Sequence, residues 1–309
     1  MRPFRFGYQA KGASAEELLS LARAAEDAGF HVFHTSDHVG EGWSALAPLL
    51  AVADHTTRIR LCPLVLNNDF HHPVLLAQEL ASIDHLSDGR LEVGLGAGHS
   101  FTEYAAVGLP FDPPMVRKAR LAEAVEVIRQ LLDGEVVTYH GAHYQLQDIR
   151  TLRSRQDHLP LLVGVNGKPA LAHAARHADI IGLTMLGRTL EDGQSHEVRW
   201  QPERLDTTID HIRAQAGARW GTLELNVLVQ AVVIAEDRQE AAQQLVAHVP
   251  GLSVADALVT PFLALGTHDE IAQHLSMCRE RWGISYFSVR DIAGFAPIIE
   301  RLTMQDAMH

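Results

Sequence analysis

Cysteine is nearly absent from this chain of 309 residues, which contains only two copies. Two cysteines are too few for a disulfide framework, so we expect Cys62 and Cys278 to be packing residues of a cytoplasmic protein. The chain also lacks a run of the roughly 20 apolar residues that a membrane span requires. Its opening stretch, MRPFRFGYQ, is too short and too polar for a signal peptide. We therefore expect neither a secreted disulfide scaffold nor a membrane protein.

Positive charge is scarce as well. The chain has 26 Lys and Arg against 38 Asp and Glu, a formal charge of −12. A protein that binds nucleic-acid phosphates needs a basic face, so we expect no nucleic-acid partner. The hydrophobic fraction of 47% is ordinary for a folded chain and excludes a disordered one. Histidine is abundant, with 19 copies, and this makes a metal-dependent enzyme a hypothesis to test.

Short apolar runs alternate with longer amphipathic runs along the whole chain. The predicted strands cover residues 4–8, 31–36, 59–66, 91–95, 159–165, 180–185, 225–234 and 284–289. The predicted helices cover residues 14–28, 43–55, 73–86, 114–132, 169–177, 203–215, 238–247, 268–281 and 295–302. This alternation implies parallel strands with right-handed crossovers. About eight units fit a closed (β/α)₈ TIM barrel, an α/β fold that forms a single domain over residues 1–309.

Two features interrupt the regular alternation. The segment 136–147 alternates around His140 and Gly141, and this pattern predicts a short hairpin insertion. Residues 187–202 have no clear period and predict a long loop after the sixth strand, with Arg188, His196, Arg199 and Trp200 on it. Such a loop either covers the site or is a plain surface excursion. An open dinucleotide-binding sheet is disfavoured, because no G-x-G-x-x-G follows the first strand.

Functional residues of a barrel cluster after the carboxyl ends of its strands. These positions hold Gln9, Ser36 to His38, Leu64 to Asp69, Gly96 to His99, Gly164 to Lys168, Met185 to Arg188, and Arg290 with Asp291. The run GLGAGH, residues 94–99, either lets a ligand approach the backbone or makes a tight turn. The run GVNGK, residues 164–168, opens a helix whose free N–H groups and Lys168 suit a phosphate, or it is an ordinary loop.

Most of the histidines do not fall into a metal-binding pattern. His173 and His177 are four residues apart, but the segment HAARH lacks the Glu of H-E-x-x-H, and we expect a packed or solvated pair. The first strand ends in FGYQ instead of the H-x-H of metal-dependent barrel hydrolases. We therefore expect no metal site. His38 and His99 differ, because both fall at the predicted catalytic face, where an imidazole can transfer protons near neutral pH.

Four stretches of the chain resemble the luciferase-like monooxygenase superfamily. They are AEDAGFHVFHTSDH at 25–38, HHPVLLAQELASIDHLSDGRLEVGLGAGH at 71–99, LPLLVGVNGKPALAHAARHADIIGL at 159–183 and ISYFSVRDIAGFAPIIERL at 284–302. The resemblance covers nearly the whole chain, and the stretch 71–99 is its most specific part. The branch that uses the deazaflavin coenzyme F420 is the most similar group.

The resemblance implies a flavin or deazaflavin at the carboxyl ends of the barrel strands and hydride transfer to or from its ring. Residues that match the family's ring-binding positions are Asp37, His38, Leu64, Val65, Asn67, Gly96, Ala97 and Gly98. Among them, His38 matches a histidine that handles the proton of the substrate, and Leu64 and Val65 match a non-prolyl cis peptide. Residues that match the phosphate end are Gly164, Asn166, Gly167 and Lys168.

The chain departs from the family pattern at one position. His99 stands where the sugar-phosphate dehydrogenase branch has a catalytic Glu, and Glu103 follows four residues later. This difference weakens the case for a sugar-phosphate substrate and makes His99 a second candidate catalytic residue. The leading hypothesis is an F420-dependent oxidoreductase of a small organic substrate. The alternatives are an FMN-dependent monooxygenase, a metal-dependent barrel hydrolase and a barrel that binds cofactor without turnover. The resemblance also implies a homodimer.

Overall fold

The computed structural model describes residues 2–11, 14–40, 42–190 and 196–307. Its main sheet is parallel throughout and runs in the order β3-β2-β1-β15-β12-β9-β8-β5-β4. These strands are β1 (Arg5–Gln9), β2 (Val32–Thr35), β3 (Arg60–Pro63), β4 (Leu66–Asn67), β5 (Val93–Gly96), β8 (Leu161–Val165), β9 (Ile180–Leu183), β12 (Glu224–Leu228) and β15 (Ile284–Val289). A parallel bridge between Leu61 and Leu91 closes the ring. Because β3 and β4 are two halves of one interrupted strand, the sheet is the predicted eight-stranded barrel.

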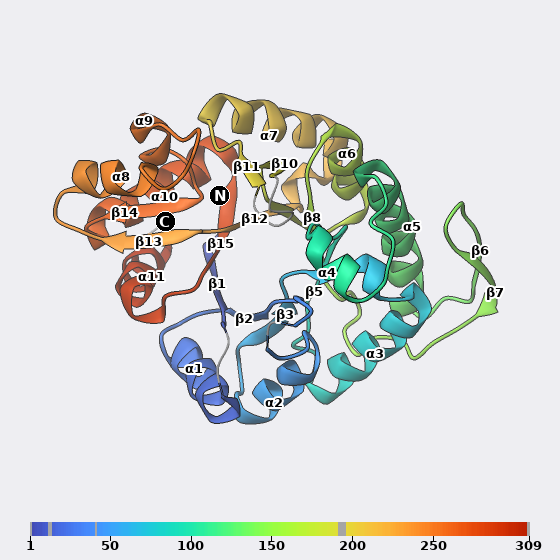
Figure 1. Cartoon of the computed structure of the whole chain (residues 1–309). Coiled ribbons are helices and arrows are strands. Elements are labelled where there is room, and N and C mark those ends of the chain that lie inside the picture. Colours follow the sequence, from blue (N-terminus) through green and yellow to red (C-terminus); the bar gives the residue numbers. More distant parts are fainter. Residues whose placement is uncertain (1, 12–13, 41, 191–195, 308–309) are drawn as a thin grey trace.

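Helices surround the barrel on its outer side (Figure 1). They are α1 (Ala15–Asp27), α2 (Ala47–His55), α3 (Pro73–Leu86), α5 (Pro114–Leu132), α6 (Lys168–His177), α7 (Pro202–Ala216), α10 (His268–Trp282) and α11 (Ile292–Ala307). Local sequence explains where several of them begin. The Ser14 side chain accepts a hydrogen bond from the N–H of Glu17 and caps α1. Pro73 and Pro114 occupy the first turns of α3 and α5, where a missing N–H costs nothing, and both predicted ranges are confirmed.

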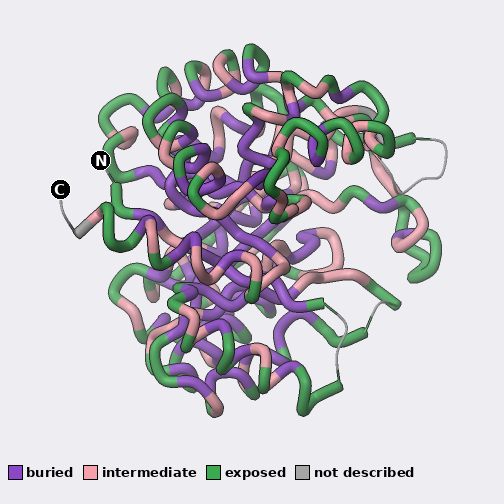
Figure 2. Tube along the Cα trace, turned by 90° about the vertical axis from the view of Figure 1, so that its left-hand side faces the viewer, coloured by how far each residue is buried: buried purple, intermediate pink, exposed green. Residues whose placement is uncertain are grey.

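Burial follows the barrel closely: the central strands are buried and the helices are exposed on their outer faces (Figure 2). Parallel strands covered by helices on one face and by the barrel interior on the other are mostly apolar. Cys62 packs inside the barrel with Val32, Leu162, Ile180 and Tyr286. Both cysteines are buried free thiols, as expected for packing residues.

The structure corrects the prediction in the seventh unit. The strand expected over residues 225–234 is two strands, because the chain leaves the barrel after β12. Its second part, β13 (Ala231–Ile234), pairs with β14 (Leu263–Gly266) in a separate parallel sheet, and β14 was not predicted. Between them lie α8 (Arg238–Val246) and the short α9 (Val254–Ala257). Helix α2 also begins at Ala47, four residues later than predicted, with Pro48 in its first turn.

The two predicted interruptions have different outcomes. The hairpin is confirmed as β6 (Val137–His140) and β7 (Gln145–Ile149), which projects from the side of the barrel (Figure 1). The segment 187–202 contains an antiparallel ribbon of β10 (Leu186–Thr189) and β11 (His196–Val198) instead of an irregular loop. Its residues 191–195 lie outside the described residues. The short elements η1 (Asn68–Phe70), α4 (Phe101–Ala106) and η2 (Gly217–Gly221) were not predicted. Of the helices described, none is both long and apolar enough to cross a membrane.

Candidate active site

A cavity of about 1980 Å³ opens at the carboxyl ends of the barrel strands. The residues that match the family's cofactor-binding positions, together with His99, all line this cavity. They are Asp37, His38, Leu64, Val65, Asn67, Gly96, Ala97, Gly98, His99, Gly164, Asn166, Gly167 and Lys168. From the segment 187–202, His196, Arg199 and Trp200 also line it, which supports the interpretation of this segment as part of the site. The fold thus brings segments far apart in the sequence to one place.

Asp37 uses its carboxylate to hold the interrupted barrel strand. Oδ2 of Asp37 accepts a hydrogen bond of 2.8 Å from the backbone N–H of Asn67 in β4, and Nε2 of His71 lies 3.5 Å from the same oxygen. The side-chain oxygen of Asn67 in turn accepts from the N–H of Asp69. These bonds fix the backbone that follows β3, so Asp37 has a structural function at the edge of the cavity.

The peptide bond between Leu64 and Val65 is cis, as the family resemblance implies. The carbonyl oxygen of Leu64 accepts a hydrogen bond of 3.0 Å from Nε2 of Gln9, whose Oε1 accepts one of 2.8 Å from Arg290. The side chain of Val65 fits against the glycines of neighbouring strands. A Cβ on Gly96 would lie 2.6 Å from Cγ2 of Val65.

The glycine turn is needed first of all for the packing of the protein itself. Gly98 has a φ of +69°, and a Cβ there would overlap the hydroxyl of Tyr104 and lie 2.5 Å from Oδ1 of Asn67. The Tyr104 hydroxyl lies 3.0 Å from that same Oδ1 and 2.9 Å from Oδ2 of Asp69. The turn therefore makes room for protein side chains, and its predicted approach to a cofactor stays a proposal.

Three imidazoles and one carboxylate meet at the rim of the cavity. Nδ1 of His38 lies 2.8 Å from Oε1 of Glu103 in α4. The ring of His99 lies between those of His38 and His196, at centroid distances of 5.8 and 5.1 Å. Nε2 of His196 is 3.2 Å from Nδ1 of His99. The sequence prediction named Glu103 only as a neighbour, and the structure makes it the direct partner of His38.

The chemistry of His99 differs from what its position in the sequence suggests. His99 is exposed at the rim, but the protein atoms around its ring lower the pKa of the imidazole to about 4. The nearby imidazoles of His196 and His38 act in the same direction. His99 is therefore neutral at neutral pH, and it can donate or accept a hydrogen bond there but does not act as a cationic acid.

The segment from Gly164 to Lys168 forms the start of α6, beside the cavity. The backbone oxygen and Oδ1 of Asn166 accept hydrogen bonds of 2.9 and 2.6 Å from Nζ of Lys118. Gly167 precedes the helix with a φ of +81°, and no side chain among the described residues caps this end. Lys168 is exposed and lines the cavity. A helix N-terminus with two lysines nearby is a suitable place for an anion.

Arg117 is a site residue that the sequence prediction missed. It lines the cavity from α5, retains 6% exposure, and stacks its guanidinium 3.9 Å from the centre of the Phe111 ring. Its Nε and Nη1 have no hydrogen-bond partner among the described residues. A buried cation with unsatisfied donors is costly unless a ligand pairs with it. Because Arg117 follows no barrel strand, only the basic pair Arg117–Lys118 near the start of a helix could have indicated it.

The cavity does not support the metal-dependent hydrolase hypothesis. Of the described residues, only Glu126, His173 and His177 place three donor atoms close enough to hold an ion together. None of these three residues lines the cavity. The imidazoles at the rim are not part of this group, and the chemistry that they offer is proton transfer or hydrogen bonding.

Comparisons with known proteins agree with this geometry. The F420-dependent glucose-6-phosphate dehydrogenase of Nakamurella multipartita is 35% identical over 187 residues, 57% of this chain and 55% of the relative. This chain thus spans about half the length of that relative. The enzyme of the same name from Beutenbergia cavernae is 34% identical over 251 residues, 72% of this chain and 74% of the relative.

Solved structures and family profiles extend the match over the chain. The structure of monooxygenase RslO1 from Streptomyces bottropensis aligns with a TM-score of 0.72 and 27% identity, covering 98% of both chains. The luciferase-like monooxygenase family profile matches residues 2–253. The chain belongs to the luciferase-like monooxygenase family.

Proposed function

We propose that this protein is an F420-dependent oxidoreductase that transfers a hydride between the coenzyme and a small organic substrate. The relatives from Nakamurella multipartita and Beutenbergia cavernae, both named F420-dependent dehydrogenases, support the choice of coenzyme. The observation that carries the proposal is the buried guanidinium of Arg117, which lines the cavity and has two nitrogens without a hydrogen-bond partner among the described residues. F420 is a phosphorylated anion, so its binding would place negative charge beside this cation.

The charge of the chain makes these local donors important. With a formal charge of −12, the protein as a whole repels an anionic coenzyme. Arg117, Lys118, Lys168 and the N-terminus of α6 supply positive charge at the cavity itself. They would bind the phosphate end, while Asp37 and the segment around Val65 would form the wall beside the deazaflavin ring.

His38 is the residue best suited to handle the substrate proton. When bound, F420 supplies a carbon that accepts or donates a hydride, and orientation and electrostatics are left to the protein. If Nδ1–H of His38 donates to Glu103, the other nitrogen, Nε2, is the one that takes or returns the proton of an alcohol or carbonyl. Glu103 also stabilises the imidazolium that forms. His99, neutral at neutral pH, would orient the substrate by hydrogen bonding.

Cofactor binding tests the proposal directly. Apoprotein is titrated with F420 and, separately, with FMN, and binding is followed by the fluorescence of each cofactor. We expect F420 to bind more tightly, and reduced F420 to be oxidised, or oxidised F420 reduced, with one member of a panel of alcohols and carbonyls. Tighter binding of FMN would overturn the choice of coenzyme and favour a flavin monooxygenase.

We further propose that the protein acts as a homodimer in a reducing cytoplasm. The two buried free thiols, Cys62 and Cys278, support a reducing compartment, because neither is placed to form a disulfide. Light scattering of the purified protein should give twice the mass of one chain, and a single-chain mass would contradict the dimer.

A further inference from the structure

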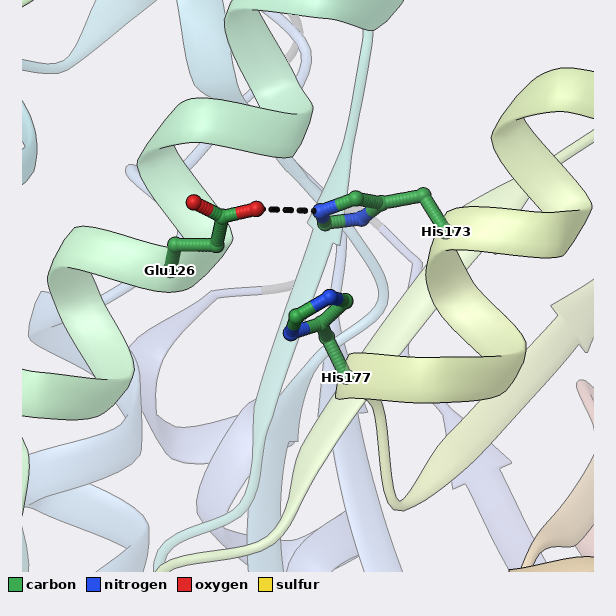
Figure 3. A group of neighbouring side chains, drawn as sticks. All are labelled: Glu126, His173 and His177. Carbon is green, nitrogen blue, oxygen red and sulfur yellow. Dashed lines mark hydrogen bonds and ion pairs between the residues drawn. The ribbon is translucent and has the colours of Figure 1, made fainter. Parts of the chain in front are cut away.

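Two histidines stand side by side on the face of α6 that is turned toward α5 (Figure 3). His173 and His177 are one helical turn apart, so they share a face of the helix. Their rings stack with centroids 4.3 Å apart and an angle of 17° between the planes. Glu126 points toward them from α5, and its Oε1 lies 2.9 Å from Nε2 of His173 (Figure 3).

The three side chains place one donor atom each in a small volume. A nitrogen of each histidine and a carboxylate oxygen of Glu126 all lie within 4.8 Å of one another. In a tetrahedral zinc site, bonds of about 2.0–2.2 Å place neighbouring ligand atoms roughly 3.3 Å apart. The donor atoms are therefore already close to the spacing that a common ion requires.

The surroundings of the three residues resemble those of a metal site. Oε2 of Glu126 accepts a hydrogen bond of 3.0 Å from the hydroxyl of Tyr139, which holds the carboxylate in place as outer partners of metal ligands do. Glu126 and His173 are half-buried and His177 is exposed, so an ion can enter from solvent.

We propose that Glu126, His173 and His177 form a site for a divalent transition-metal ion, with zinc as the best fit, that links α5 to α6. Two imidazoles and one carboxylate are ligands that suit zinc, and water would complete its coordination. The sequence disfavours such a site because HAARH contains no Glu. The carboxylate comes from another helix, which the spacing along one segment cannot reveal.

The site is distinct from the cavity and is independent of the proposed function. None of its three residues lines the cavity, whereas Lys168, at the other end of α6, does. A metal here would therefore stabilise the helix that supplies the proposed phosphate-binding segment. Its function would be structural, and its effect should be visible in the apoprotein without F420.

Metal binding to untagged, chelator-treated protein tests the proposal. Zinc chloride is added in a calorimeter, and cobalt is added separately to follow the visible absorption bands of tetrahedral Co²⁺. We expect one zinc ion per chain with micromolar affinity, a higher melting temperature with zinc, and tetrahedral cobalt bands. His177→Ala and Glu126→Gln should each weaken zinc binding by about tenfold or more.

Two variants control for other histidines. His140→Ala removes an exposed imidazole on β6, and His99→Ala removes one from the cluster at the cavity rim. Both should bind zinc like the parent protein. The proposal is overturned if zinc does not bind at micromolar concentrations, if His177→Ala and Glu126→Gln bind it unchanged, or if His99→Ala abolishes binding. Because His177 is exposed, its replacement leaves the fold intact, which circular dichroism can verify.

Discussion

Glu103 holds the imidazole of His38, with Oε1 of the carboxylate 2.8 Å from Nδ1 of the ring. The carboxylate comes from α4 and the histidine from the segment after β2, so only the closed barrel brings them together. The contact gives His38 a fixed orientation and a partner for its proton. Histidines that work as acids or bases in enzymes commonly depend on such a partner.

The first prediction concerns this pair. His38→Ala should lower turnover by about 10²–10⁴-fold, the usual contribution of one acid–base group, with a much smaller effect on cofactor affinity. Glu103→Gln should lower turnover less, because the amide still fixes the ring but stabilises its cation poorly. Steady-state kinetics and cofactor titration measure the two effects. Glu79→Gln, at an exposed position of α3, is the control. Unchanged turnover in His38→Ala would remove His38 from the mechanism.

The second prediction concerns Arg117. Arg117→Met keeps most of the side-chain volume but removes the buried charge. Loss of a charge-assisted hydrogen bond costs about 1.5–3 kcal/mol, so F420 should bind roughly 10- to 150-fold more weakly. The apoprotein should be at least as stable as the parent, because the unpaired guanidinium is costly without a ligand. Arg58→Met, at an exposed position, should change neither property. Equal cofactor affinity in Arg117→Met and the parent would contradict the assignment.

Lys168 should contribute less than Arg117, because its ammonium is exposed. Lys168→Ala is expected to weaken F420 binding by a few-fold and to reduce the salt dependence of the affinity. Titrations at low and high salt separate this electrostatic effect from a loss of packing. If the affinity of Lys168→Ala matches that of the parent at low salt, Lys168 does not belong to the phosphate site.

Two glycines allow the packing of the turn to be tested separately from its backbone conformation. Gly98 and Gly108 have nearly the same φ, +69° and +71°, but a Cβ on Gly108 would meet nothing within 4 Å. Gly108→Ala should therefore cost only the conformational penalty of about 1 kcal/mol. Gly98→Ala should cost clearly more, because it also displaces the Tyr104 hydroxyl from Asn67. Chemical denaturation measures both, and equal losses would mean that the packing at Gly98 is unimportant.

The barrel and the cavity lining follow from the sequence because strand ends mark them. The positions of His38 and Lys168 were predictable since each comes two or three residues after a buried apolar run, and that of Val65 was implied by the family resemblance. Arg117 and Glu103 were not predictable, because they lie on helices whose contacts depend on tertiary packing. For the same reason the sequence did not indicate Glu126, which lies on α5 and joins the two histidines of α6, His173 and His177, in one cluster.

The seventh unit shows the corresponding limit for the fold. The mostly apolar run over residues 225–234 contains no Gly or Pro that would mark a turn, yet the chain leaves the barrel after Leu228 and pairs next with β14. The N–H of Gln230 already donates to the carbonyl of Phe262. Hydrophobic pattern alone predicts that a strand is buried, but not which sheet it joins.

Two fully enclosed histidines make stability depend on pH. Inside the barrel, His34 donates from Nδ1 to the carbonyl of Cys62 at 3.1 Å, and its Nε2 lies 3.0 Å from the hydroxyl of Ser288. Nε2 of His274, on α10, lies 3.0 Å from the carbonyl oxygen of Thr260. Burial lowers the pKa of each imidazole to about 4, compared with 6.5 for an ordinary histidine.

The sign of the effect follows from where the proton binds. Between pH 6.5 and pH 4 these histidines bind protons in the unfolded chain but not in the folded protein. The free energy of unfolding therefore falls as the pH falls through this window. Each histidine should account for about 3 kcal/mol of the loss. Denaturation at pH 7 and pH 4.5 measures it in the parent, in His34→Gln and in His274→Gln. Each variant should be less stable than the parent at pH 7. Between pH 7 and pH 4.5, however, its free energy of unfolding should fall by about 2–3 kcal/mol less than that of the parent. The carboxylates contribute the same pH dependence in all three proteins. If the free energy of unfolding falls by the same amount between pH 7 and pH 4.5 in the parent and in both variants, these two histidines are not the cause.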